Sequence, residues 1–323
     1  MTKPNKIVAL AQAHEVPDPS MPKALLKLAP KKSKPVPPTT WEGFRDELRK
    51  AVRKWHHAQQ LRIGIDHQRS DRKSKTTGEI IPSAFDDDER ATLGQVAQVY
   101  ASLEDESEKD MCRLVRAHPM WKAWLKNCPG VSEKTAAQLL ACIDFAKCVK
   151  PSQLSRFCGV SMDRSGDKMV SQRARRPQPY VDASGKLVKP KGETLSYNPL
   201  LKRALFLWVE ALCKNASRFE SISGSRYYRR FEEKSHGLKT TRLDRKPWWI
   251  RRTAQRCAER LFVEDLYIIG RTMLGLPVWP DYHASRLGYA HGGKICVNEP
   301  RTMTLDEALA LVGGNETIAE AAE

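Results

Sequence analysis

The sequence lacks any apolar run that approaches the roughly 20 residues a helix needs to cross a bilayer. It also lacks a secretory pattern near its start, because the apolar patch at residues 7–13 is short and is followed by acidic and proline residues. We therefore expect a cytoplasmic protein with no membrane partner.

Metal-binding cysteine patterns are missing as well. The eight cysteines form no C-x-x-C pair and do not group with histidines at zinc spacing. A buried thiol behaves as a small apolar side chain. We expect reduced core cysteines and no metal site on this chain.

Acidic residues are scarce relative to basic ones. The chain has 38 Asp+Glu against 55 Lys+Arg, a formal net charge of +17. Such a charge attracts polyanions and gains free energy from counterion release. DNA is the favoured partner and structured RNA a second one, while a surface that docks an acidic protein is the blander alternative.

The chain divides into segments of different pattern. Residues 1–38 carry seven lysines, two acids and many prolines, which predicts a disordered basic arm. Apolar residues from Trp41 to Trp55 recur at spacings of three and four, and a second helical run begins at the acidic residues 86–89, where a helix N-terminus favours negative charge. We expect a helical or coiled-coil arm over 39–117.

The most informative stretch is 128–143, around Pro129-Gly130. A glycine in a tight turn between two helices lets backbone N–H groups face a phosphate. The spacing therefore predicts a helix-hairpin-helix in which Gly130, Ser132, Lys134 and Thr135 contact DNA. Ser132 stands where this motif normally has a second glycine, and it suits an N-cap. An ordinary helical hairpin is the alternative.

A long segment, residues 161–192, follows no helical period and is strongly basic. A long polar loop inside a folded region is more often functional than accidental. We expect it to follow a phosphate backbone, with a small hairpin at 181–188, whereas a solvated insertion is the alternative. The cations proposed to bind DNA here are Arg164, Lys168, Arg173, Arg175 and Arg176.

Two further helical segments follow. One begins at Asn198-Pro199, and the other runs over about 248–274 and opens with Trp248-Trp249, which we expect to anchor it on a core. Between them, residues 227–231 interleave aromatics with Arg229 and Arg230, a pattern that suits base stacking and phosphate contact, or simple helical packing. The prediction is a mainly α fold, with a helix-hairpin-helix domain over 118–290 and a C-terminal tail over 291–323.

The order of these parts resembles the IS one-ten/one-sixteen/nine-oh-two family of insertion-sequence transposases. The resemblance covers about residues 86–277 and is carried by the helical arm, the helix-hairpin-helix and the segments at 154–159, 165–166, 198–205 and 228–231. It implies a role in transposition and DNA recombination of a mobile genetic element. It also implies that Ser165 is the nucleophile of strand transfer, with Arg164, Lys168 and Arg173 stabilising the phosphoryl oxygens.

Two departures from the family stand out. Asp167 replaces the second glycine after Ser165, and an acid there repels a scissile phosphate. Full-length members also resemble a fusion to an N-terminal RuvC-like nuclease domain with four metal-binding carboxylates, which residues 40–117 do not match. We expect no cofactor on this chain. Mg²⁺ chemistry would need a partner nuclease or an oligomer, and a non-catalytic DNA- or RNA-binding accessory protein is the alternative, with Ser165 an ordinary turn residue.

Overall fold

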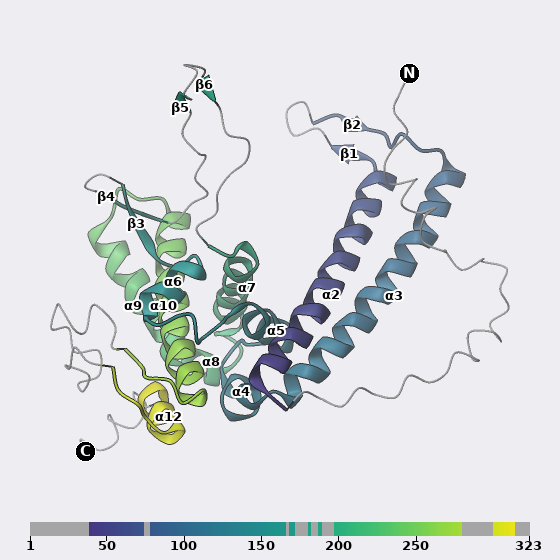
Figure 1. The fold of residues 1–323 in the computed structure, drawn as a ribbon. Coiled ribbons are helices and arrows are strands. Elements are labelled where there is room, and N and C mark those ends of the chain that lie inside the picture. Colours follow the sequence, from purple (N-terminus) through teal and green to yellow (C-terminus); the bar gives the residue numbers. More distant parts are fainter. Residues whose placement is uncertain are drawn as a thin grey trace. The chain divides into compact units, whose positions relative to one another are not determined.

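The computed structural model describes residues 39–73, 78–165, 168–171, 180–181, 187–188, 197–279 and 300–313, which are mainly helical, as predicted (Figure 1). The basic arm expected over 1–38 lies outside this range. The elements in chain order are α2 (Trp41–Arg69), β1 (Arg72–Lys73), β2 (Ile80–Ile81), α3 (Asp87–Ala117), α4 (Pro119–Ala123), η2 (Leu125–Asn127), α5 (Glu133–Cys142), α6 (Pro151–Phe157), β3 (Met162–Ser165), β4 (Lys168–Ser171), β5 (Tyr180–Val181), β6 (Leu187–Val188), α7 (Pro199–Asn215), α8 (Glu220–Ser223), α9 (Arg226–Thr241), α10 (Pro247–Met273) and α12 (Leu305–Gly313).

Helices α2 and α3 form the expected helical hairpin, with the β1–β2 ribbon between them (Figure 1). Asp86 caps α3 by accepting a hydrogen bond from the Glu89 N–H at 2.8 Å, and the Glu89 carboxylate accepts one from the Asp86 N–H at 3.1 Å. This capping box confirms that the acidic run starts a helix. Farther along, Glu104 of α3 accepts hydrogen bonds from Gln59 and Arg62 of α2.

The hairpin continues into the following helices. His118, which ends α3, is buried with its ring centroid 4.7 Å from that of Trp41 and 5.1 Å from that of Phe44. Arg45 of α2 forms an ion pair with Asp144, beyond α5, at 2.7 Å. Residues on both sides of the boundary expected at 117/118 therefore share one core.

The core of the helical body lies between α4, α5, α7 and α10. The Trp208 and Phe262 rings stack with centroids 4.3 Å apart, and Trp124 stacks on Phe262 from the other side at 5.7 Å. The apolar face of α7 is buried in this core and comprises Leu201, Leu205, Trp208 and Leu212. Packing in this core holds α5 and α7 together, and these two helices carry the candidate site.

Part of the expected C-terminal tail belongs to the fold. Arg301 pairs with Val278 in an isolated antiparallel bridge, and α12 packs against α10. Ala308 and Val312 are four residues apart on one face of α12 and are buried, and Met303, which precedes the helix, is buried as well. Residues within 300–313, part of the expected tail, therefore pack on the helical body.

Two hairpins interrupt the basic segment. The pairing of Tyr180 with Val188 and of Val181 with Leu187 confirms the small hairpin predicted near 181–188. The β3–β4 hairpin, in which Met162 pairs with Ser171, was not predicted, because its residues show no clean alternation of apolar and polar types. The segment expected to be a loop therefore contains short antiparallel pairs.

Arg271 holds the last turns of α10 to the chain around α6. Arg271 is 3% exposed, and its guanidinium donates hydrogen bonds to the carbonyl oxygens of Phe145, Cys148 and Pro277 at 2.7 to 3.1 Å. The same group lies 5.8 Å from the centroid of the Tyr267 ring. One side chain thus satisfies three carbonyl groups from two separate loops.

Replacing Arg271 with methionine should lower the free energy of unfolding by about 3 kcal/mol, because buried carbonyls lose their donors. Urea denaturation measures this change. Arg113→Met is the matched control, since Arg113 is 37% exposed in its pair with Asp110 and such pairs contribute at most about 1 kcal/mol. Equal losses in both variants would contradict the assigned role of Arg271.

Candidate nucleic-acid interface

The turn that precedes α5 is fastened to α7. The Trp208 indole N–H donates to the Pro129 carbonyl oxygen at 2.9 Å, and Gly130 has a φ of 74°, in the left-handed region. A Cβ on Gly130 would lie 3.5 Å from the Leu212 backbone nitrogen, so the side of the glycine that would carry a side chain faces α7. Glycine is needed here for its backbone conformation. Phosphate contact by this residue stays a prediction.

Ser132 is the N-cap of α5, as the sequence predicted. Its Oγ accepts a hydrogen bond from the Thr135 N–H at 3.2 Å, and the two hydroxyl oxygens lie 3.0 Å apart. Ser132 is exposed and Thr135 is half-buried. The structure thus brings these two predicted contact residues together at the start of α5.

Acidic side chains already pair with the cations beside this turn. Lys134 Nζ lies 2.7 Å from Glu108 Oε2, and Arg116 forms a two-pronged pair with Glu133 at 2.5 and 2.9 Å. The hydrogen bond from Arg116 lowers the pKa of Glu133. Exposed pairs of this kind contribute at most about 1 kcal/mol. A phosphate can therefore exchange with the carboxylates at little cost.

The two ends of the basic segment meet at the junction of α6 and α7. The Asn198 N–H donates to the Phe157 carbonyl oxygen at 2.8 Å. A Cβ on Gly159 would lie 3.1 Å from the Tyr197 ring, and Lys202 Nζ lies 4.1 Å from the centroid of that ring. The chain between Ser161 and Tyr197 is an insertion with adjoining ends, which we call the basic insertion.

Within the basic insertion, the backbone pairs Ser165 with Lys168 at the end of the β3–β4 hairpin, and Arg164 with Met169. The candidate nucleophile and two of its proposed phosphate partners therefore belong to one hairpin. Arg173, Arg175 and Arg176 lie outside the described residues, as does Asp167.

The aromatic and basic run at the start of α9 is mostly packing. Tyr227 is buried, and its hydroxyl donates to Asp265 at 2.8 Å, so its ring does not stack on a base. Arg229 is exposed, and Arg230 is half-exposed and lies 3.5 Å from Glu233. For Tyr227, the packing alternative is confirmed.

Trp248 departs from its prediction. We expected both tryptophans at the start of α10 to anchor the helix, but Trp248 is 66% exposed while Trp249 is half-buried. Arg245 lies over Trp249, with its guanidinium carbon 5.2 Å from the ring centroid. Because neighbouring residues on a helix point about 100° apart, only one of the pair faces the core. This rule could have identified the exposed one as a candidate contact residue.

Three arginines of α10 form ion pairs with acids. Arg251 pairs with Glu210 of α7 at 3.1 Å, Arg252 with the buried Glu259 at 2.7 Å, and Arg260 with Glu264 at 2.9 Å. These contacts neutralise much of the positive charge on this part of α10.

Neither a metal centre nor a reactive thiol emerges from the described part of the chain. It holds no group of three His, Cys, Asp or Glu side chains able to bind a metal ion, and no helix long and apolar enough to cross a membrane. The seven cysteines within it are free, and burial raises the pKa of Cys148 and Cys213 to about 11. Those two thiols are therefore protonated at neutral pH and poorly nucleophilic.

No family model matches the chain, and no curated protein matches it either. The transposase resemblance therefore stays an interpretation of residue patterns. Independently of it, the geometry places the turn before α5 and the root of the basic insertion on one helix, α7.

Proposed function

We propose that this chain is a transposase-like protein of DNA recombination that binds duplex DNA through the turn before α5 and the basic insertion. The observation that carries the proposal is that one helix, α7, holds both of these features. Trp208 of α7 holds the turn, and Asn198, the N-cap of α7, holds the root of the insertion. Ten residues of helix separate the two, roughly 15 Å of rise. That is comparable to the roughly 12 Å width of the major groove, so both features can reach one face of a duplex.

Charge supports the same conclusion. Residues 161–192 contain eight cations and three acids, so the basic insertion concentrates positive charge. Several cations of the helical body are instead paired with acids, among them Lys134, Arg251 and Arg252. Contacts from the insertion to phosphates would fix the position of the protein without selecting a sequence.

Catalysis is the second half of the proposal. The Ser165 Oγ would attack a DNA phosphorus and form a serine–phosphate ester while the P–O bond to one deoxyribose breaks. The serine proton would pass to the departing deoxyribose oxygen, which leaves as a hydroxyl, and cations on the same hairpin would stabilise the phosphoryl oxygens. Residues 86–89 do not fit a magnesium site, because Asp86 and Glu89 are engaged in the capping box of α3. We derive no step through a metal held by this chain, and a metal-dependent step would need a second copy or a separate nuclease.

The binding proposal predicts that duplex affinity falls steeply with salt concentration and that cations of the basic insertion account for much of this fall. Changing Arg173, Arg175 and Arg176 to glutamine should weaken duplex binding more than about tenfold at 0.1 M salt. It should also reduce the slope of log K against log salt by roughly 3, about 0.9 for each lost phosphate contact. Fluorescence anisotropy with a labelled blunt duplex measures both quantities.

The matched control removes the same charge from α2, by changing Lys50, Arg53 and Lys54 to glutamine. All three side chains are exposed and distant in sequence from the insertion. The control should change the slope by less than about 1. An equal change in both triple variants would show that only overall charge matters and would overturn the proposed interface.

A further inference from the structure

The end of α9, the connection to α10 and the first turn of α10 together expose two large apolar side chains among cations. Leu243 is 86% exposed and Trp248 is 66% exposed. The cations beside them are also at the surface. We call this surface the α9–α10 tip, and it comprises Lys239, Arg242, Leu243, Arg245, Lys246 and Trp248.

The α9–α10 tip carries a net positive charge that its surroundings leave largely uncompensated. Four cations stand against one acid, Asp244, which pairs with Arg245 at 3.2 Å. Within the described ranges, Lys239, Arg242 and Lys246 have no ion-pair partner. This contrasts with the paired arginines of α10 and makes the tip a candidate site for phosphate.

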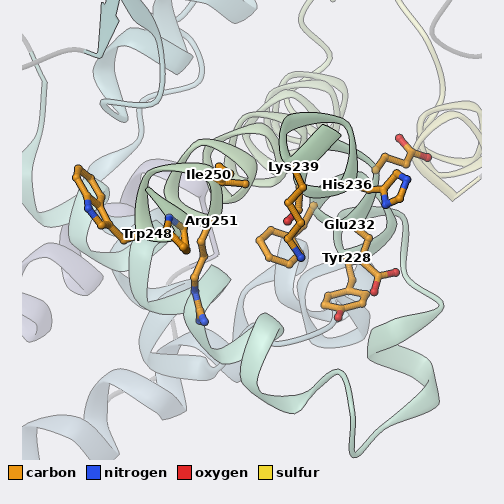
Figure 2. Close-up of a pocket in the computed structure, with 11 residues that line it drawn as sticks. Tyr228, Glu232, His236, Lys239, Trp248, Ile250 and Arg251 are labelled. Atoms are coloured by element: carbon orange, nitrogen blue, oxygen red, sulfur yellow. The ribbon is translucent and has the colours of Figure 1, made fainter. Parts of the chain in front are cut away.

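A groove along α9 leads away from the tip. Figure 2 shows Trp248 at one end of it, Tyr228 and Glu232 toward the other, and Lys239 and Arg251 between them. Glu232 lies at the end with Tyr228 and would repel phosphates. A polyanion is therefore expected at the end with Trp248.

We propose that the α9–α10 tip binds an unpaired stretch of DNA, with Trp248 stacking on a base and Lys239, Arg242 and Lys246 contacting the adjacent phosphates. An indole needs the open face of a base, which single strands offer and paired duplex interiors do not. Pro247 restricts the backbone in the first turn of α10, so the backbone that carries Trp248 is ordered before DNA binds. This inference rests on the proposed DNA binding and specifies a second contact.

The test compares single-stranded and duplex DNA. Trp248→Ala should weaken binding of a labelled oligonucleotide of about twenty thymidine nucleotides roughly tenfold, as expected for loss of one stacked base. The same substitution should change the affinity for a blunt duplex by less than about twofold. Trp248→Phe should retain most of the affinity, because a phenyl ring still stacks. Arg242→Gln with Lys246→Gln should reduce the single-strand salt slope by about 1.4.

Phe219→Ala is the matched control, because Phe219 is an aromatic residue 54% exposed outside the tip. It should leave both affinities unchanged, and circular dichroism should show that every variant is folded. The inference is overturned if Trp248→Ala behaves like this control. It is also overturned if single-strand and duplex binding fall equally, or if the substitution abolishes only binding to phosphatidylserine vesicles. A wild-type protein that binds no duplex would instead defeat the proposed function.

Discussion

Substitution of Ser165 by alanine should reduce DNA strand cleavage and joining by at least about a thousandfold while leaving DNA affinity within about twofold. A nucleophile supplies the oxygen that bonds to phosphorus, and alanine has no atom that replaces it. Interactions that only bind DNA are retained, so the loss falls on the chemical step. A cleavage and joining assay on plasmid DNA with Mg²⁺, run beside anisotropy measurements, separates the two effects.

The position of Ser165 explains why its substitution is expected to affect the chemical step and not DNA affinity. It ends β3 opposite Lys168, whereas the turn at Pro129 and the α9–α10 tip belong to other elements. Ser161→Ala is the appropriate control, since Ser161 is a neighbouring serine that directly precedes β3. Its substitution should leave cleavage intact.

The outcomes also discriminate between the two functions considered. Equal activity in Ser165→Ala and wild type would refute the nucleophile assignment. Tight, salt-sensitive binding by a wild type that cuts no DNA, with or without a partner nuclease, would favour the non-catalytic accessory protein.

The helices could be predicted from sequence because their causes are local. Thr40, Asp86, Ser132 and Asn198 each cap a helix by accepting hydrogen bonds from N–H groups two or three residues ahead. Apolar residues at spacings of three and four then define the buried face. A cap and a period both lie within a few residues, so reading along the chain finds them.

The candidate interface was only partly predictable, because its charges are set by distant partners. Nothing near Lys134 in the sequence reveals that Glu108 of α3 pairs with it, and the Arg251–Glu210 pair joins α10 to α7. The exposure of Trp248 depends on how α10 rotates on the core. Residue type predicted a basic protein, but tertiary packing decides which cations are available.

A buried carboxyl group links α9, α10 and α12. Asp265 is 2% exposed, accepts the Tyr227 hydroxyl hydrogen bond and lies 3.5 Å from Arg226, which also donates to the Val312 carbonyl oxygen. Burial raises the pKa of Asp265 to about 7, although the charge of Arg226 and the Tyr227 hydrogen bond oppose the rise. The neutral acid therefore suits this site better than the carboxylate.

The contribution of His118 to stability changes with pH in the direction opposite to that of Asp265. Burial lowers its pKa from 6.5 to about 4, and its Nδ1 accepts a hydrogen bond from the Met120 N–H. Its stabilising contribution is present above pH 6.5 and is lost as pH falls through 4. The contribution of Asp265 is present below about pH 3.8 and is lost as pH rises through 7. Between pH 4 and 6.5 the two effects partly cancel in the wild type.

Replacing Asp265 with asparagine should remove the contribution of Asp265 to the pH dependence of stability and leave that of His118. Asparagine keeps an oxygen that accepts the hydrogen bond of the Tyr227 hydroxyl, and it cannot ionise. As pH rises from 4 to 8, the unfolding free energy of the variant should therefore increase by up to roughly 4 kcal/mol relative to that of the wild type. Urea denaturation across this range measures the difference. The variant alone should become markedly more stable between pH 4 and 6.5, as His118 loses its proton in the unfolded state. Parallel curves for the two proteins would show that Asp265 is ionised throughout and that Arg226 outweighs its burial.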